Sequence, residues 1–365
     1  MNDLNAAETE VREGVVFQHV SFDEHEQVVF CRDRASGLKA LIGIHSTTLG
    51  PALGGTRMWP YASETDALND VLRLSRGMSF KASISGLDLG GGKAVILADS
   101  RTQKTPAMME AFGRFVEGLS GRYITAEDVG IGPADMVSVH KHTRNVTGLP
   151  VEMGGSGDPS PFTAWGVFRG MQAAAQAQWG TDSLSGRTVW VQGVGHVGET
   201  LVRHLTEAGA RVLVSDLYAD RLEIISRQYG ATVIGADEGY SAPIDVYAPC
   251  ALGATLNDHS IEHLRCSIVA GAANNQLMNE ERHGALLREK GVLYAPDFLI
   301  NAGGLINVNR EIAHYDEAES MRRTTGIYDT TLALFERAER DGITPHQAAL
   351  RMAQERILAR AGSSN

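Results

Sequence analysis

One glycine-rich segment constrains the fold of this chain more than any other feature. The apolar run TVWVQ at 188–192 leads into the sequence GVGHVG, and an amphipathic stretch, ETLVRHLTEAGA, follows at once. A strand, a glycine turn and a helix in this order begin a parallel βαβ unit, whose helix N-terminus presents free amide groups to phosphate oxygens. We therefore predict a dinucleotide site that includes the turn residues Gly193, Gly195, His196, Val197 and Gly198.

An acidic residue follows the next apolar run. Asp216 ends the run RVLVSD, about 20 residues beyond the first glycine, where a carboxylate accepts hydrogen bonds from the ribose hydroxyls of NAD and repels the extra phosphate of NADP. The alternative is a glycine turn that binds no ligand. The context of strand, turn, helix and acidic strand end favours NAD as the cofactor.

Further apolar runs indicate the architecture around this site. IDVYAPC, CSIVAGAAN and GVLYAPDF alternate with helical stretches, which is typical of a Rossmann-type, doubly wound parallel sheet. The N-terminal half differs, because GVVFQHV, QVVFCRD and LKALIGIHS are short β-rich runs joined by turn signals, and helices are expected at 64–78 and 106–119. This half predicts a mixed α/β domain that contains antiparallel strands.

The chain length of 365 residues exceeds the usual size of one hydrophobic core. We therefore expect two domains separated by a cleft, with a hinge in the Gly-, Pro- and Ser-rich segment 145–161. A substrate-binding and oligomerisation domain would comprise 1–148 and a C-terminal helix at about 335–365. The NAD-binding Rossmann domain would comprise 149–334.

Composition excludes several classes of function. The formal net charge is −11 and no cluster of basic residues occurs, which argues against a nucleic-acid or acidic-membrane partner. No run of about 18 apolar residues could span a bilayer, and the polar, acidic first 14 residues resemble a mobile extension rather than a secretory signal, so we expect a cytoplasmic protein. The three cysteines and the pair His140 and His142 lack metal-ligand spacing, so no metal site is predicted.

Two lysines bracket a glycine run in the first half of the chain. If Lys81 and Lys93 both line a pocket, one can pair with a substrate carboxylate, while burial and a cationic neighbour lower the pKa of the other and make it a base. Solvated surface lysines are the alternative. Asp128 follows the β-rich run RYITAE, but Glu127 and Asp128 could equally cap the helix expected in GPADMVSVHKH.

An ordered series of motifs resolves these alternatives by resemblance. It comprises TTLGPALGGTRMW, GLDLGGGKAVI, GRYITAEDVG, GDPSPFTAWGVFRGM, QGVGHVG, YAPCALGATLN, AGAANNQL and YAPDFLINAGGLINV. By this series the chain resembles the glutamate, leucine, phenylalanine and valine dehydrogenase superfamily, and within it the leucine dehydrogenase branch. The resemblance covers nearly everything from about residue 17 to residue 360.

The resemblance implies a role for each matching residue. Lys81 would bind the substrate carboxylate, Lys93 would activate water and move protons, and Asp128 would be the acidic partner near the amino group. Further substrate contacts are implied at Leu53, Gly54, Gly55, Ala126, Asn275, Leu305 and Val308. Thr163, Cys250, Ala251 and Asn274 would touch NAD, with Asn275 a candidate for either ligand. We do not interpret Cys250 as a nucleophile, because no sequence neighbour would lower its pKa.

The implied activity is reversible, NAD-dependent oxidative deamination of a branched-chain L-amino acid to its 2-oxo acid and ammonia, by a homo-oligomer that is a dimer or an octamer. Ala126 is like the leucine branch, whereas Leu305 and Ile131 resemble the tryptophan dehydrogenase branch. Leucine, isoleucine and valine are therefore the first expectation. The alternatives are an aromatic substrate, phenylalanine or tryptophan, and an NAD-binding regulator without catalysis.

Overall fold

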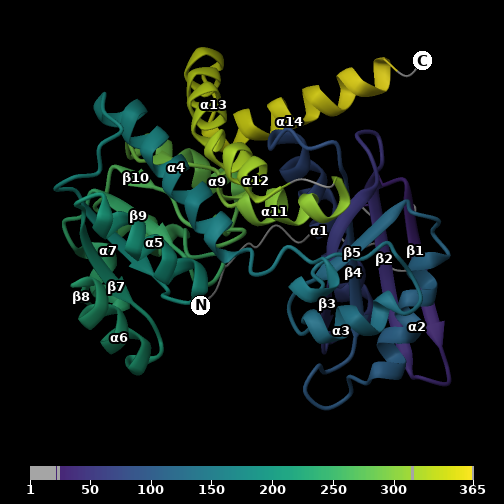
Figure 1. Ribbon diagram of the computed structural model, residues 1–365. Helices are drawn as coiled ribbons and strands as arrows, with labels where there is room; N and C mark the ends of the chain where they lie inside the picture. The colour runs from purple at the N-terminus through teal and green to yellow at the C-terminus, as the bar shows by residue number, and fades with distance from the viewer. Residues whose placement is uncertain (1–21, 23–24, 314–315, 364–365) are drawn as a thin grey trace, which may run out of the picture. The chain divides into compact units, whose positions relative to one another are not determined.

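The computed structural model describes residue 22, residues 25–313 and residues 316–363, and it divides into two compact units (Figure 1). The first unit is the chain up to Ser79 together with Asp88–Met153, and the second is Phe80–Leu87 together with the chain from Gly154 onward. The predicted N-terminal extension and the β-rich run GVVFQHV lie outside the described residues.

The first unit contains a mixed five-stranded sheet. Its strands are β1 (Gln27–Asp33), β2 (Leu38–Ser46), β3 (Ala52–Trp59), β4 (Gly90–Leu97) and β5 (Tyr123–Glu127), in the order β1-β2-β4-β3-β5. β2 pairs antiparallel with β1 and β4, whereas β3 pairs parallel with β4 and β5. The predicted mixed α/β domain with antiparallel strands is confirmed, and its parallel part places the carboxyl ends of β3, β4 and β5 at one edge.

Three helices accompany this sheet: α1 (Glu64–Ile84), α2 (Pro106–Glu117) and α3 (Pro133–His140). Helix α2 begins as the sequence predicts, because Thr105 caps it through a hydrogen bond from the Met108 amide and Pro106 starts the first turn. Helix α1 continues six residues beyond the predicted end at residue 78. No glycine or proline interrupts residues 79–84, and the chain leaves the helix only at Gly86, whose φ is +70°.

The second unit contains a six-stranded, all-parallel sheet in the order β11-β10-β9-β6-β7-β8. The strands are β6 (Thr188–Gln192), β7 (Arg211–Ser215), β8 (Thr232–Val233), β9 (Val246–Pro249), β10 (Ile268–Val269) and β11 (Leu293–Tyr294). This is the strand order of a Rossmann fold, so the predicted two-domain α/β class is confirmed. Strand β8 was not predicted, because its two residues are exposed and too few to show a periodicity.

The helices of the second unit cover this sheet and form a helical layer. They are α4 (Ser160–Trp179), α5 (His196–Glu207), α6 (Ala219–Tyr229), α7 (Ala236–Ser241), α8 (Asp258–His263), α9 (Glu280–Glu289), α10 (Asp297–Ile300), α11 (Gly303–Ala313), α12 (Glu317–Thr325), α13 (Ile327–Asp341) and α14 (Pro345–Gly362); a short 3-10 helix, η3 (Val151–Met153), ends the first unit. α4 packs against α5, α11 and α13. Gly166 and Gly170 permit α10 to approach α4 closely, because a Cβ at either position would lie within 3 Å of Ile300.

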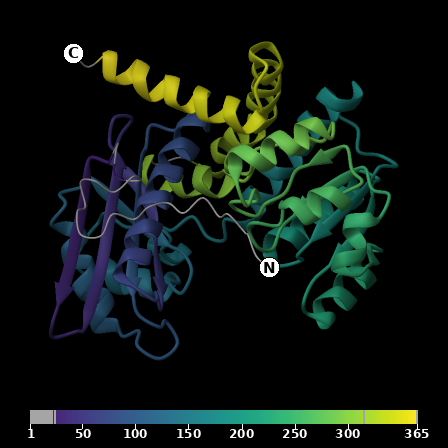
Figure 2. The ribbon, with the colours of Figure 1, turned by 180° about the vertical axis from the view of Figure 1, so that it is seen from behind.

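The C-terminal helix α14 belongs to the second unit, and Figures 1 and 2 show it in yellow beside α13. It contacts α13, α9 and β11, and Arg337 of α13 pairs with Glu355 at 2.8 Å. It also contacts the segment at the end of α1, where Arg356 donates to the Leu87 carbonyl at 2.7 Å. The grouping thus differs from the boundaries expected from sequence, which separate residues 335–365 from the Rossmann domain. A role for this helix in oligomerisation stays a prediction. Among the described residues, no helix has both the length and the apolar character needed to cross a bilayer.

Candidate active site

Lys93 and Asp128 lie side by side in the first unit. Lys93 is on β4 and only 7% exposed, and Asp128 directly follows β5. The Lys93 Nζ and the Asp128 Oδ2 are 2.5 Å apart. Asp128 does not cap α3, because the N-cap is Gly132 and its amide donates to Asp135 instead. Capping of α3 by Asp128 is therefore wrong, and the catalytic role of Asp128 stays a prediction.

Arg57 and Asp70 extend this pair into a network that the sequence analysis missed. The Arg57 Nε lies 3.4 Å from the Asp128 Oδ2, and its Nη1 lies 2.9 Å from the Asp70 Oδ2. The Tyr61 hydroxyl donates to the same Asp70 oxygen at 2.6 Å. A signal was available: Arg57 is two residues beyond Gly55 on β3, so it shares the strand face at which a Gly55 Cβ would meet Asp128.

Burial and charge act against each other in this network. Burial lowers the pKa of Lys93 below its usual value, although the Asp128 carboxylate opposes this, and the Arg57 guanidinium lowers it further. Burial alone would raise the pKa of Asp128, but the charges of Lys93 and Arg57 outweigh it and the pKa of Asp128 is lowered. The cation that acts on Lys93 is thus Arg57, a residue not anticipated from sequence.

The glycines of β3 and β4 are required by close strand packing. A Cβ at Gly54 would lie 1.6 Å from the Gly92 carbonyl oxygen, and one at Gly55 would lie 2.4 Å from the Glu127 carbonyl oxygen. The Gly54 carbonyl also accepts a hydrogen bond from the Tyr123 hydroxyl at 2.6 Å. These glycines bring β5, and with it Asp128, close to the face that carries Lys93.

The remaining predicted residues of the N-terminal half lie either buried on strands or half-buried at the end of α1. Leu53 and Ala126 are buried, 3% and 8% exposed, and lie on neighbouring strands β3 and β5. Lys81 is half-buried in the last turn of α1 and groups with the second unit. The glycine-dense segment therefore begins as helix at Lys81 and becomes strand at Gly90, rather than forming one flexible loop.

The dinucleotide turn has the geometry that its sequence predicts. Gly193 has a φ of +97°, and a Cβ there would lie 2.6 Å from the Ala251 Cβ. A Cβ at Gly198 would lie 2.0 Å from the Gly193 carbonyl oxygen, so α5 packs tightly on the turn. At Gly195, by contrast, no atom lies within 4 Å of an added Cβ. The middle glycine therefore faces open space at the N-terminus of α5.

The Asp216 carboxylate is fixed beside this turn. Its Oδ2 accepts from the Val194 amide at 2.8 Å and its Oδ1 from the Tyr218 amide at 3.0 Å. His196 is exposed and Val197 half-buried at the start of α5. The carboxylate thus stands next to the open space, as expected of a ribose-binding group.

Other predicted cofactor residues follow the ends of neighbouring strands. Cys250 and Ala251 follow β9, and burial raises the pKa of the Cys250 thiol to about 12, which agrees with our interpretation that it is not a nucleophile. Asn274 and Asn275 follow β10 and are exposed, and Asn301 donates to the Asn274 Oδ1 at 2.8 Å.

Helix elements supply the rest of the predicted residues in this unit. Thr163, in the first turn of α4, donates to the Pro159 carbonyl at 3.1 Å and lies close enough to Gly304 to exclude a side chain there. Leu305 is 7% exposed and Val308 half-buried. Being three residues apart on α11, they share one face of that helix.

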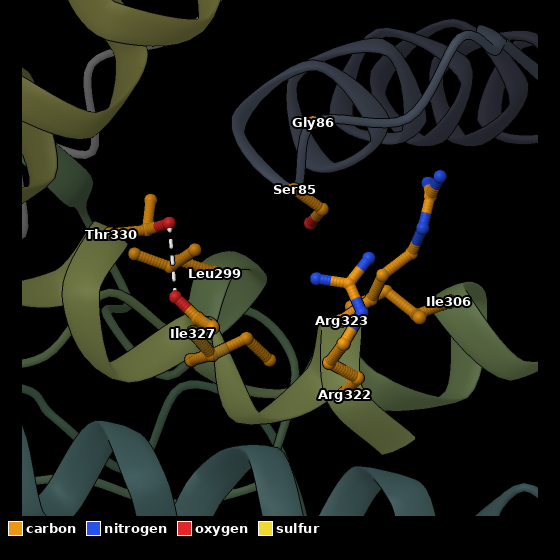
Figure 3. A pocket seen from close by; sticks show the side chains of 9 residues that line it. Ser85, Gly86, Leu299, Ile306, Arg322, Arg323, Ile327 and Thr330 are labelled. Carbon is orange, nitrogen blue, oxygen red and sulfur yellow. Dashed lines mark hydrogen bonds between the residues drawn. The ribbon is translucent and has the colours of Figure 1, made fainter. Parts of the chain in front are cut away.

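A separate cavity of about 280 Å³ lies in the second unit and is lined by none of the predicted site residues (Figure 3). Its walls are Ser85, Gly86, Leu299, Ile306, Arg322, Arg323, Gly326, Ile327 and Thr330. Both arginines contact Glu319, at 2.8 and 2.9 Å, and Thr330 donates to the Gly326 carbonyl. The charges around the cavity are thus largely compensated within α12.

Comparison with known proteins identifies the family. Residues 25–145 match the family described as Glu/Leu/Phe/Val dehydrogenase, dimerisation domain, and residues 154–220 and 214–361 match Glutamate/Leucine/Phenylalanine/Valine dehydrogenase. The leucine dehydrogenase of Thermoactinomyces intermedius is 54% identical over 94% of this chain and 93% of its own length. The L-tryptophan dehydrogenase of Nostoc punctiforme is 48% identical over 94% of this chain and 96% of its own.

A solved structure agrees in fold as well as in sequence. The crystal structure of L-tryptophan dehydrogenase from Nostoc punctiforme superposes with a TM-score of 0.83 at 47% identity, covering 93% of this chain and 97% of that one. Two matching domain families and relatives of this identity over almost the whole length leave one assignment: the chain belongs to the glutamate, leucine, phenylalanine and valine dehydrogenase family of amino-acid dehydrogenases.

Proposed function

We propose that the protein is an NAD-dependent dehydrogenase that oxidatively deaminates leucine, isoleucine and valine to their 2-oxo acids and ammonia, reversibly. The observation that carries the proposal is the buried Lys93 in contact with Asp128, beside Arg57. A lysine whose pKa burial lowers, next to a carboxylate that stays ionised, supplies the base and the anion that deamination of an α-amino acid needs.

The turn residues fit a dinucleotide. Gly195 leaves space at the N-terminus of α5, Gly193 provides the left-handed backbone, and the Asp216 carboxylate is oriented by two amides. Gly193, Gly195, His196, Val197 and Gly198 would hold the pyrophosphate, and Asp216 the adenosine ribose. Thr163, Cys250, Ala251 and Asn274 would line the remainder. NAD, when bound, accepts the α-hydrogen of the substrate as hydride, and the carboxylate of Asp216 favours NAD over NADP.

The residues of the first unit divide the proton transfers between them. Asp128 binds the substrate ammonium and takes its proton, so that the amine is neutral when the hydride leaves. Lys93, in its neutral form, removes a proton from the water that attacks the resulting substrate iminium. It then returns this proton to the carbinolamine nitrogen and takes the hydroxyl proton as the carbonyl forms and ammonia leaves. Arg57 keeps Asp128 ionised and favours the neutral form of Lys93. Lys81 would hold the substrate carboxylate as a fixed cation.

Branched aliphatic substrates are favoured by the predicted side-chain contacts. Leu53 and Ala126 are buried on adjacent strands, and Leu305 and Val308 share a face of α11. Gly54, Gly55 and Asn275 would border the substrate through backbone and amide groups. The methyl group of Ala126 narrows the space for an aromatic ring. A change of this size alters discrimination by about 1 to 3 kcal/mol, so an aromatic preference is the second candidate, supported by the similarity to L-tryptophan dehydrogenase.

A panel of L-amino acids tests the proposal. Formation of NADH is followed by absorbance with leucine, isoleucine, valine, phenylalanine and tryptophan, and each 2-oxo acid is tested with ammonia in the reverse direction, with NAD and with NADP. We expect the highest kcat/KM with leucine and NAD. A higher kcat/KM with tryptophan or phenylalanine would replace the substrate assignment, and NADH binding without turnover of any substrate would favour the non-catalytic regulator. Assembly as a dimer or octamer and a cytoplasmic location stay predictions from the sequence.

A further inference from the structure

We propose that Asp297 is a positioning residue for the cofactor: its buried carboxylate fixes the loop 271–277, and through it Asn274 and Asn275, in the conformation that receives the dinucleotide. This inference rests on the proposed function, because it takes Asn274 and Asn275 as cofactor or substrate contacts. It assigns Asp297 a role that the motifs of the sequence did not indicate.

The loop itself needs an anchor. It follows β10 at the carboxyl edge of the parallel sheet, which is the edge where ligands bind in folds of this class. Asn275 has a φ of +52°, in the left-handed region, which asparagine adopts more readily than most residues with a side chain but at some cost in free energy. Contacts that hold the neighbouring backbone therefore stabilise this conformation.

Asp297 provides a buried point of attachment directly after this residue. It is 5% exposed at the start of α10. Its Oδ2 accepts from the amide of Gln276, which is itself fully buried, at 3.1 Å, and its Oδ1 accepts from the Phe298 amide at 2.8 Å. One carboxylate thus joins the loop to α10, and the peptide that it holds is the one that follows Asn275.

The rest of the loop is tied to this point. The Gln276 side chain donates to the Gly271 and Ala273 carbonyls at 2.8 and 3.0 Å, which closes the loop on itself. The Asn275 carbonyl accepts from the Ala254 amide at 2.7 Å. Asn301, the C-cap of α10, also donates to the Ala272 carbonyl and to the Asn274 Oδ1, at 3.0 and 2.8 Å. Helix α10 thus holds the loop at two points, and Asp297 supplies the one at the peptide next to Asn275.

A carboxylate at position 297 is costly, because it is buried. Burial raises the pKa of Asp297, while the two amide hydrogen bonds and the charges of His346 and Lys81 act in the opposite direction. A group that served only to fill space would be apolar at this position. The buried carboxylate is therefore best explained by the hydrogen bond that it accepts from the loop.

The experiment compares Asp297→Asn with a matched control, Asp245→Asn. Asp245 also accepts a backbone amide hydrogen bond, from Thr188 at 2.7 Å, but it lies at the opposite end of the sheet, before β9. NADH affinity is measured by fluorescence titration, KM and kcat are measured for NAD and leucine, and hydrogen exchange is followed in the peptide containing 271–277.

For Asp297→Asn we expect NADH to dissociate about tenfold more readily, the KM for NAD to rise by a similar factor and exchange in 271–277 to accelerate. Asp245→Asn should lower the melting temperature and leave NADH affinity within about twofold of the wild type. Wild-type NADH affinity in a folded Asp297→Asn variant would overturn the proposal. An Asp297→Asn variant that does not fold would also overturn it, because the carboxylate would then support the whole domain.

The proposed function fails separately. If the wild-type protein does not bind NADH, the cofactor assignment is wrong whatever Asp297 does. Hydrogen exchange in the free protein still reports whether Asp297 holds the loop, since that measurement needs no ligand.

Discussion

The two units prepare for chemistry in opposite ways. In the first unit, the charged side chains of Lys93, Asp128 and Arg57 pack together on and beside strands. The neighbouring glycines are so closely packed that no Cβ would fit. In the second, the turn at Gly193 offers backbone amides, and Gly195 stands beside space that no atom of the second unit occupies within 4 Å of its Cβ position. The first site is thus formed by charged side chains, and the second by backbone amides beside open space.

The two carboxylates illustrate the same difference. Asp128 contacts Lys93 and Arg57, cations that lower its pKa. Asp216 accepts hydrogen bonds from two amides, and both of its oxygens are held by the turn and the start of the following segment. A carboxylate between cations stays ionised and is suited to binding a substrate ammonium group, whereas one held by amides is suited to a fixed hydrogen-bonding role.

The largest expected effect comes from removing the base. Lys93→Ala should lower kcat for leucine by about 10³-fold or more, because general acid–base groups of this kind contribute up to about 10⁴. The first site would lose its chemistry while the second stays intact. NADH affinity, measured by fluorescence titration, should therefore stay within about twofold of the wild type.

Retained turnover in Lys93→Ala, above a few per cent, would contradict the assignment. Arg73→Ala is the control, because Arg73 pairs with Asp70 at 3.2 Å and is largely exposed, so it belongs to the same charge network without touching Lys93 or Asp128. It should leave kcat nearly unchanged.

Two alanine substitutions in the glycine turn distinguish the loss of space for a ligand from overpacking of the protein. Gly195→Ala adds a methyl group to open space at a backbone φ of −70°, so the melting temperature should hardly change while NADH binds about tenfold more weakly. Gly198→Ala puts a Cβ 2.0 Å from a carbonyl oxygen, and overpacking of this kind should lower the free energy of unfolding by about 1–3 kcal/mol or more. Thermal denaturation with and without NADH distinguishes the two, and equal losses of stability would refute the contrast.

The same contrast explains which features the sequence could predict. The strand, turn and helix from Thr188 to Glu207 are local: hydrophobic period, glycine spacing and an acidic strand end lie within about 30 residues, so the Rossmann unit and the position of Asp216 follow from pattern alone. The pairing of Lys93 with Asp128 depends on β4 and β5 both flanking β3, and although the family resemblance implied a role for each residue, the contact between them was not predicted. Strand order is a long-range property that no local pattern contains.

The residues that were missed are long-range in the same sense. Arg57 and Asp70 meet because α1 packs on the sheet, with Val71 against Leu41 and Val95. Arg57 lies in the motif TTLGPALGGTRMW, but no chemical role was read from it, and Asp70 lies in none of the motifs. The end of α1 was placed six residues too early, at residue 78, although residues 79–84 contain only residues that a helix tolerates. The grouping of α14 with the second unit depends on its packing against α9, α13 and β11.

A smaller effect is expected when the amide-held carboxylate loses its charge. Asp216→Asn keeps the shape and one acceptor oxygen but no longer repels a 2′-phosphate. The ratio of kcat/KM for NAD to that for NADP should fall by about tenfold, which corresponds to ~1.4 kcal/mol. Steady-state kinetics with both cofactors measure the ratio. An unchanged ratio would mean that the ribose is bound by another residue, and the first site should be unaffected in either case.

The finest test shifts the titration of Lys93 in two directions. Because the neutral amine is the base, kcat/KM rises with pH as Lys93 loses its proton, and the position of this rise follows the pKa of Lys93. Asp128 raises that pKa, and Arg57 lowers it after the larger effect of burial. Asp128→Asn should therefore move the rise to lower pH, at a reduced maximum, and Arg57→Gln should move it to higher pH.

The charged groups that act on Lys93 are Asp128, Arg57 and Asp70, so Arg73→Gln serves as the control without a shift. If both variants shifted the rise in kcat/KM to the same side, the rise would belong to a group other than Lys93. The buried charges of the first site would then not set its pH dependence.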